Sequence, residues 1–136
     1  MENKNYNLKY KNINIDVINL VKKAILEDRF FKKEDAEKLI YLKMMLIKLN
    51  NIYNLATNLD LTTEKTDGYY NTLNRTIYLK KLSLLTFLHE FKHSIQHQKG
   101  LNNNEEIARG YSCSLFYLAS PFHYNRAIEK GIIFFA

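Results

Sequence analysis

Two stretches in the first half of the chain have the apolar spacing of amphipathic helices. Apolar residues recur every three or four positions from residue 15 to about residue 31, and again over residues 34–56. The second stretch has a broad apolar arc, which predicts a helix that packs on more than one side. We therefore expect residues 1–60 to form a helical N-terminal part of the protein.

The next segment changes from helical to strand-like spacing. Residues 57–67 are short and polar, and we expect them to form a loop or an edge strand. Residues 68–71 and 75–79 are rich in Tyr, Thr and Ile, which favour strands, and a turn-like segment separates them. This pattern predicts an antiparallel β-hairpin that leads into the following helix.

Start and stop signals bracket two further helices. Ser83 is a favourable N-cap and Gly100 is a favourable residue just beyond a helix end. Between them, apolar residues recur at i, i+4, i+7 and i+11, which predicts one buried stripe. A second helix is expected to begin at Glu105 or Glu106 and to stop before Pro121.

Together these elements predict an α+β fold in one domain that covers residues 1–136. The domain is expected to be mostly helical, with a small antiparallel hairpin or sheet. Residues 68–121 are expected to form its catalytic core. The tail from Phe122 to Ala136 ends in an apolar run. We expect this run to pack as a strand or to return to the core.

Composition limits where the protein is expected to be located and which residue types could bind a metal. The N-terminus lacks the apolar run of a signal peptide, and lysines interrupt the longest apolar stretch, so we expect a soluble, cytoplasmic protein. The net charge is +6, from 20 basic and 14 acidic residues, and the lysines are scattered. This favours a solvated basic surface over a nucleic-acid patch. The single Cys113 rules out an internal disulfide framework and leaves His and carboxylates as possible metal ligands.

Residues 89–93 have the sequence His-Glu-Phe-Lys-His, an H-E-x-x-H motif inside a predicted helix. Positions i and i+4 share a helix face, so His89 and His93 can both bind one Zn²⁺ ion at roughly 2.0–2.1 Å. Glu90 lies about 100° round the helix, where it can take the proton of a water that the ion makes acidic. The motif predicts a zinc peptidase with one zinc per chain and Glu90 as the catalytic base.

A third protein ligand would come from the following helix. Glu105 has the small residues Ala108 and Ser112 at i+3 and i+7, which would allow close packing and point Glu105 at the same metal. Glu106 also has small neighbours and is the alternate third ligand, and both glutamates could instead only stabilise the helix dipole. Two His and one Glu with an open fourth position are the ligand set of one class of catalytic zinc sites.

Other polar residues have weaker assignments. His97 lies eight residues after the first motif histidine, a rise of about 12 Å, so it cannot join that histidine on one ion. It is expected either to support the site from outside or to be a surface residue. Tyr111, His123, Tyr124 and Arg109 are candidates for the donor that stabilises the oxyanion, and the sequence does not choose among them.

Five pieces between residues 68 and 121 occur in a recognisable order: Gly68-Tyr69-Tyr70, Ile77-Tyr78-Leu79, HEFKHSIQH from His89 to His97, Glu105-Glu106-Ile107-Ala108, and Leu118-Ala119-Ser120-Pro121. In this order they resemble the ImmA/IrrE family of small, gluzincin-like zinc metallopeptidases, although Lys92 stands where the family usually has Gly. The resemblance implies a zincin-like fold in which His89, His93 and Glu105 bind zinc and Glu90 is the base.

The resemblance also implies a substrate class, namely transcriptional repressors of phages or mobile elements. The predicted partner is therefore a protein substrate, with no direct nucleic-acid or membrane binding. An extended substrate is expected to pair with the hairpin strand that ends near Leu79. One alternative is a zinc-stabilised interaction protein, such as a phage anti-defence or regulatory factor, without essential peptidase activity. The other is a nucleic-acid-binding helical domain in which the motif occurs by chance.

Overall fold

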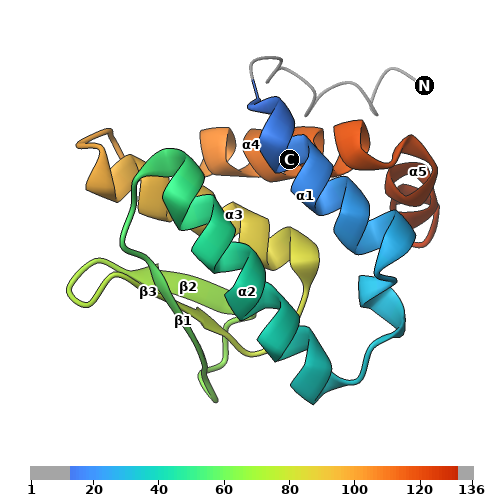
Figure 1. Cartoon of the computed structure of the whole chain (residues 1–136). Coiled ribbons are helices and arrows are strands. Elements are labelled where there is room, and N and C mark those ends of the chain that lie inside the picture. The colour runs from blue at the N-terminus through green and yellow to red at the C-terminus, as the bar shows by residue number, and fades with distance from the viewer. Residues whose placement is uncertain (1–12, 132–136) are drawn as a thin grey trace.

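The structure is a computed structural model, and it describes residues 13–131 (Figure 1). Its elements in chain order are α1 (Ile15–Lys22), a π-helical turn η2 (Lys23–Glu27), a 3₁₀ turn η3 (Phe30–Lys32), α2 (Asp35–Tyr53), β1 (Asn58–Leu61), β2 (Gly68–Asn71), β3 (Thr76–Leu79), α3 (Leu84–Gln98), α4 (Glu105–Ala119) and α5 (Pro121–Glu129). The expected mixed α+β class is confirmed, because helices dominate the described chain and its strands form one small sheet.

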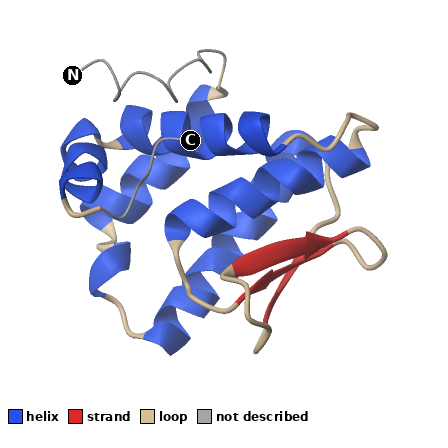
Figure 2. Cartoon of the chain, turned by 180° about the vertical axis from the view of Figure 1, so that it is seen from behind, coloured by secondary structure: helices blue, strands red, loops and turns tan. Residues whose placement is uncertain are grey.

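Helix α3 is the element around which the others are arranged. It packs against β2 and β3 on one side and against α4 on another, and α4 also contacts α1 and α5. The sheet lies to one side of the helices, with α3 between the strands and α4 (Figure 2). None of the helices in residues 13–131 is long and apolar enough to cross a membrane.

The sheet has the strand order β1-β3-β2, so β3 is its middle strand. β2 is antiparallel to β3, with Tyr70 opposite Ile77, which confirms the predicted hairpin. β1 is parallel to β3, with Leu59 opposite Ile77, so part of the polar segment 57–67 is an edge strand. The sheet is therefore mixed rather than purely antiparallel, because a parallel pairing joins segments that are distant in sequence and leaves no local signal.

The predicted ends of α3 are confirmed. Ser83 Oγ accepts a hydrogen bond from the Thr86 N–H at 3.2 Å, and Gly100 adopts the left-handed φ of 72° just beyond the helix. The predicted apolar stripe is buried, with Leu88 and Phe91 fully inside the core. Because this stripe faces the core, the rotation of α3 about its axis is fixed, and so is the direction of the motif histidines.

The first predicted helix is shorter and less regular than expected. α1 ends at Lys22 and continues as η2 to Glu27, and Arg29 with φ of 51° turns the chain into η3. Asp28 stabilises this turn, since its carboxylate accepts hydrogen bonds from Lys23 Nζ at 2.9 Å and from the Tyr41 hydroxyl at 2.6 Å. The turn allows Phe30 to be buried, and the continuous helix predicted to residue 31 is wrong for this reason.

One other expectation also needs correction. α2 packs on one side only, because Ile40, Met44 and Ile47 are each about 60% exposed. Beyond α4, Pro121 occupies the first turn of a further helix, α5, where its missing N–H costs nothing. The apolar run 132–135 lies outside the described residues.

Replacing Gly68 with alanine is expected to destabilise the protein by about 1–3 kcal/mol through overpacking. A Cβ at Gly68 would lie 2.9 Å from Leu79 Cδ2, 3.0 Å from Thr86 Cγ2 and 3.1 Å from the Tyr78 carbonyl oxygen. The last of these atoms is backbone, so β2 would have to move away from β3 and α3. Urea unfolding measures the change, and Leu73→Ala in the exposed hairpin turn is the control. An unchanged midpoint for Gly68→Ala would show that β2 packs less tightly here.

Candidate metal centre

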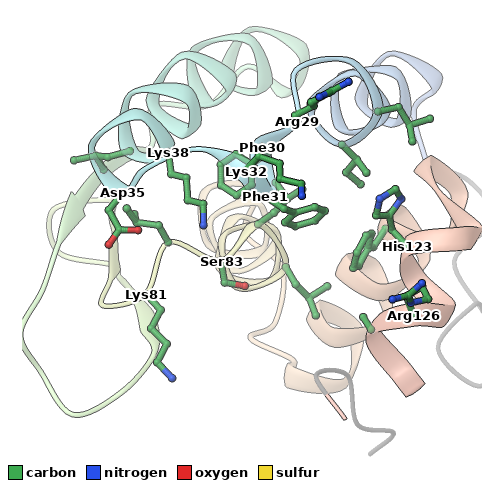
Figure 3. A pocket seen from close by; sticks show the side chains of 18 of the residues that line it. Arg29, Phe30, Phe31, Lys32, Asp35, Lys38, Lys81, Ser83, His123 and Arg126 are labelled. Atoms are coloured by element: carbon green, nitrogen blue, oxygen red, sulfur yellow. The ribbon is translucent and has the colours of Figure 1, made fainter. Parts of the chain in front are cut away.

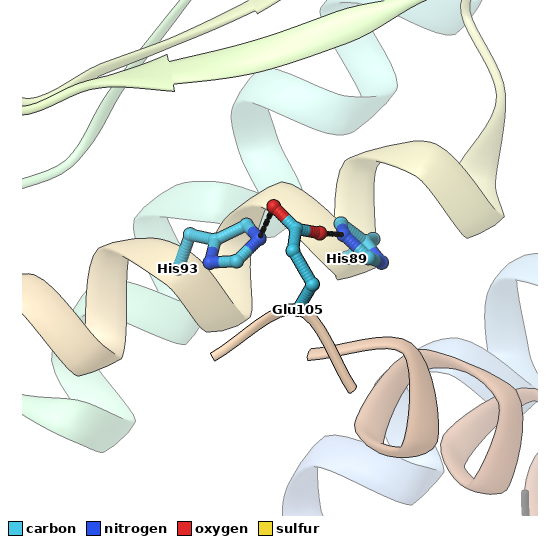
Figure 4. Close-up of side chains that lie close together, drawn as sticks. All are labelled: His89, His93 and Glu105. Carbon is cyan, nitrogen blue, oxygen red and sulfur yellow. Dashed lines mark hydrogen bonds and ion pairs between the residues drawn. The ribbon is translucent and has the colours of Figure 1, made fainter. Parts of the chain in front are cut away.

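Three predicted ligands converge between α3 and α4. His89 and His93 project from α3, and Glu105 is the first residue of α4 (Figure 4). His89 Nε2 lies 2.9 Å from Glu105 Oε1, and His93 Nε2 lies 3.2 Å from Glu105 Oε2. One donor atom from each of the three residues lies within 4.8 Å of the others, close enough for all three to bind one ion.

The local sequence explains why Glu105 reaches the histidines. Asn104 caps α4, since its side-chain oxygen accepts a hydrogen bond from the Ile107 N–H at 2.9 Å. Glu105 therefore begins the helix directly beside α3. Ala108 and Ser112, which follow it at i+3 and i+7, are buried and α4 packs on α3, as their small size predicts. Glu106 is outside the group, so of the two candidate glutamates it is Glu105 that lies within reach of both histidines.

His93 is held by a residue that the sequence interpretation missed, Gln96. His93 Nδ1 lies 2.9 Å from Gln96 Oε1. The orientation of this amide is set by the Asn104 backbone, because Gln96 Nε2 donates to the Asn104 carbonyl at 3.1 Å and Oε1 accepts from the Asn104 N–H at 3.3 Å. Because Oε1 can only accept, His93 Nδ1 must carry a proton, so in the neutral ring Nε2 has the lone pair.

The free lone pair makes the donor set fit a cation. His93 Nε2 is buried and makes no hydrogen bond, although Glu105 Oε2 lies only 3.2 Å away. In the neutral imidazole two electron-rich atoms would face each other there, which is unfavourable unless a positive charge lies between them. A metal ion supplies that charge, and neutral imidazole nitrogens with a carboxylate are ligands that suit Zn²⁺.

The ionisation of the ligands agrees with this fit. Burial lowers the pKa of His89, although the hydrogen bond to Glu105 opposes the change. Burial also raises the pKa of the Glu105 carboxyl, but the hydrogen bond with His89 and the nearby His93 outweigh it and bring that pKa below its ordinary value. A neutral imidazole and an ionised carboxylate are the forms that bind a metal.

Glu90, the predicted base, is buried beside the group but is not part of it. Burial raises the pKa of Glu90 to about 7, and the charge of Glu105 acts in the same direction. His93 and the backbone of Tyr70 on β2 oppose this change. The carboxyl can therefore exchange a proton near neutral pH.

The remaining polar candidates lie elsewhere. His97 Nδ1 is 2.9 Å from the Tyr70 hydroxyl, so His97 joins α3 to β2 and is outside the metal group. Tyr124 is fully buried, and the Tyr111 hydroxyl is 2.9 Å from that of Tyr53. Arg109 follows Glu105 by one turn on α4, and its charge contributes to lowering the pKa of His89, which favours it among the oxyanion candidates.

His123, the fourth oxyanion candidate, belongs to α5 and interacts with that helix's own cap. Its Nδ1 lies 2.7 Å from Ser120 Oγ. The strand predicted to pair with substrate also needs correction. The strand ending at Leu79 is β3, and both of its edges are occupied by β1 and β2. An added strand could pair only at an outer edge, and β2 is the edge strand that packs against α3.

Replacing Gln96 with leucine is expected to lower zinc affinity about 10–100-fold, as loss of a residue that orients a ligand usually does. Gln96→Glu keeps the acceptor for His93 and is expected to stay within about threefold of the wild type. Zinc titration measures the affinities. Nitrogen-15 spectra of the metal-free protein report the His93 tautomer, which should be the Nδ1–H form in the wild type and Gln96→Glu, and mixed in Gln96→Leu. An unchanged tautomer in Gln96→Leu would contradict the role assigned to Gln96.

Comparisons of the chain with known family models, curated proteins and solved structures find no match. What the molecule does must therefore be inferred from its own residues. Those with the clearest chemistry are the three that converge between α3 and α4, together with Glu90.

Proposed function

We propose that the protein is a zinc-dependent metallopeptidase that hydrolyses a peptide bond in a protein substrate. The observation that carries the proposal is the convergence of His89, His93 and Glu105 within reach of one ion, beside the buried carboxyl of Glu90. Each residue type occupies the position that this chemistry requires on two adjacent helices.

The three ligands would hold the ion through both Nε2 atoms and the Glu105 carboxylate, which leaves one tetrahedral position open. Zinc bound there supplies Lewis acidity, which polarises a carbonyl and makes water more acidic. Glu105 is two-thirds exposed, so solvent reaches the group from the side of this ligand. A structural zinc site is usually closed by four protein ligands, which disfavours the zinc-stabilised interaction protein as the alternative.

Glu90 is the group that would move the proton. Its carboxylate takes a proton from the attacking water and returns it to the leaving amine, so one residue acts as base and then as acid. A carboxyl with pKa of about 7 suits both steps near neutral pH. Arg109, one turn after Glu105 on α4, would stabilise the negative oxygen that forms during attack.

The substrate backbone would add to the sheet at the outer edge of β2. This edge strand packs on α3. Within it, the Tyr70 backbone hydrogen-bonds Glu90, and the Tyr70 hydroxyl hydrogen-bonds His97. Backbone hydrogen bonds to β2 would hold an extended peptide along α3, so that a peptide bond lies over the ligands. We therefore propose β2 as the strand that pairs with substrate, in place of β3, the strand ending at Leu79, because both edges of β3 are occupied.

The proposed family and substrate rest on the resemblance of residues 68–121 to the ImmA/IrrE pattern. The order of hairpin, H-E-x-x-H helix and glutamate-bearing helix is compatible with a zincin-like domain of that family, and we propose that it acts in the cytoplasm. For such an enzyme we propose a repressor of a phage or mobile element as the substrate.

Metal removal tests the proposal. Protein treated with 1,10-phenanthroline and dialysed is expected to lose hydrolysis of fluorescein-labelled casein, and one equivalent of Zn²⁺ should restore it. Mg²⁺ is the control, because two imidazoles suit it poorly. Zinc bound at one ion per chain without hydrolysis of casein or of candidate repressors would favour the interaction protein. Absence of zinc binding would overturn both the zinc peptidase and the zinc-stabilised interaction protein.

A further inference from the structure

A large groove lies at the N-terminal end of α3, outside the metal centre. Its volume is about 1240 Å³, and its walls are the η2–η3 turn with the start of α2, residues 80–85, and α5. Figure 3 shows Lys32 and Lys38 on one wall and His123 and Arg126 on the other, with Phe31 between them. The proposed peptidase mechanism uses none of these side chains.

The rim of the groove is strongly basic. Seven Lys or Arg side chains line it: three from residues 29–38, two at positions 80 and 81, Arg126 from α5, and Lys130 just after that helix. Asp35 is the only acidic residue among the described residues that line it. The cations come from three separate segments, so the positive charge surrounds the groove and would attract an anionic ligand.

The floor of the groove is apolar and partly open to solvent. Leu26 and Leu61 are each 48% exposed, Phe31 is 44% exposed and Phe122 is 64% exposed, and all four line the groove. Large apolar side chains gathered in one exposed place mark a binding surface more often than isolated ones do. A ligand that fits must therefore combine apolar groups with several negative charges.

The groove begins close to the metal centre. Leu85 lines it, and His89 follows Leu85 by four residues on the same face of α3, which is a separation of about 6 Å along the helix axis. A ligand lying in the groove could therefore continue along α3 to the ligand group.

We propose that this groove binds a segment of the protein substrate that flanks the cleaved bond and is rich in acidic and apolar residues. The inference rests on the proposed peptidase function and gives it a substrate class. The acidic side chains would pair with the rim cations, and the apolar side chains would cover the floor.

The aromatic rings in the groove favour a peptide over a nucleic acid. Arg126 lies over the Phe122 ring at 5.7 Å, and the Phe31 ring packs at 6.0–6.2 Å against His123 and Phe116. These rings already have neighbours on them, whereas single-stranded nucleic acid needs open ring faces on which bases stack. Much of the remaining floor is aliphatic.

The distribution of charge favours a peptide over a lipid. A lipid has one anionic head and would need its cations at one end of the groove. Here the cations come from all three walls. Several carboxylates spaced along an extended chain match this arrangement.

Binding of defined peptides to the metal-free protein tests the inference independently of catalysis. The probe is a fluorescein-labelled ten-residue peptide of alternating Glu and Leu, followed by anisotropy at 150 mM salt. Peptides with Lys in place of Glu, or with Ser in place of Leu, should bind at least about tenfold more weakly, because each lacks one of the two required features.

Charge reversal locates the binding. Lys32→Glu with Arg126→Glu should weaken binding of the acidic peptide at least about tenfold. Lys43→Glu with Lys48→Glu on the exposed face of α2 makes the same change in net charge and is the matched control, expected to leave binding within about twofold. Equal losses in the two double variants, or no binding by the wild type, would overturn the inference.

Two further probes test other occupants. If a twenty-nucleotide oligo(dT) or vesicles containing half phosphatidylserine bind more tightly than the acidic peptide, and only the Lys32/Arg126 variant loses them, the groove is not a peptide site. Zinc titration of the same variants keeps the two proposals separate. Peptide binding in a chain that takes up no zinc would refute the peptidase while the groove stands as a peptide site. If charge reversal leaves both zinc binding and hydrolysis unchanged, the groove proposal is refuted and the peptidase proposal stands.

Discussion

His93→Ala is expected to abolish stoichiometric zinc binding. The wild type purified without chelator should contain about one zinc per chain, and the variant should contain almost none. Zinc sites in proteins bind with roughly 10–16 kcal/mol, so losing one of three protein ligands removes about 3–5 kcal/mol, or an affinity loss of about 10²–10⁴. The buried lone pair of Nε2, fixed by Gln96, makes His93 the ligand best prepared for the ion.

His97→Ala is the matched control for this experiment. His97 lies one turn further along α3 and is outside the ligand group, so its loss should leave the zinc content unchanged. Elemental analysis gives the stoichiometry, and the zinc-dependent rise in melting temperature gives an independent measure. Full zinc content in His93→Ala, or an equal loss in His97→Ala, would mean that zinc binds elsewhere or not at all.

The parts of the site that could be predicted are those that depend on local spacing. An H-E-x-x-H motif between Ser83 and Gly100 places two histidines on one helix face whatever the rest of the fold does. The choice between Glu105 and Glu106 could not be made in this way, because it depends on how α4 is rotated against α3. The Asn104 cap determines where α4 begins. In the sequence alone, Glu105 and Glu106 both follow this cap and look equally suitable as a metal ligand.

The missed features depend on contacts between distant segments. β1 pairs in parallel with β3, and neither strand carries a sign of its partner. Gln96 looks like a spacer between His93 and His97, yet it links a ligand to the cap of the next helix. Its position three residues after His93, on the same helix face, was the available signal. Pro121 marked the end of α4 correctly, but it also begins α5, as proline often does.

Glu90→Gln is expected to lower the rate of peptide hydrolysis by about 10²–10⁴-fold while zinc remains bound. The amide has nearly the same shape as the carboxyl but cannot take a proton from water. Glu90 is outside the ligand group, so the zinc content should stay at that of the wild type. Single-turnover cleavage of a labelled peptide measures the rate. Hydrolysis above a tenth of the wild-type rate would exclude Glu90 as the base, and loss of zinc together with activity would make it a structural residue.

The same substitution is expected to stabilise the metal-free protein above neutral pH. The pKa of Glu90 is about 7 in the folded chain against 4.5 for a free carboxyl, so folding favours its protonated form. Its contribution to stability is complete below about pH 4.5 and is lost as the pH rises through about 7. Glutamine cannot ionise, so the unfolding free energies of variant and wild type should diverge over this range, by about 2 kcal/mol at pH 8 after allowing for solvent contact.

Urea unfolding at pH 5 and pH 8 in the presence of chelator measures this divergence. A constant difference between the two proteins at both pH values would show that the pKa of Glu90 is not raised by folding. The two effects of Glu90→Gln together separate a catalytic carboxyl from a structural one. A structural carboxyl would be paired and would stabilise the fold when ionised, whereas burial raises the pKa of Glu90 to about 7 and favours its protonated form.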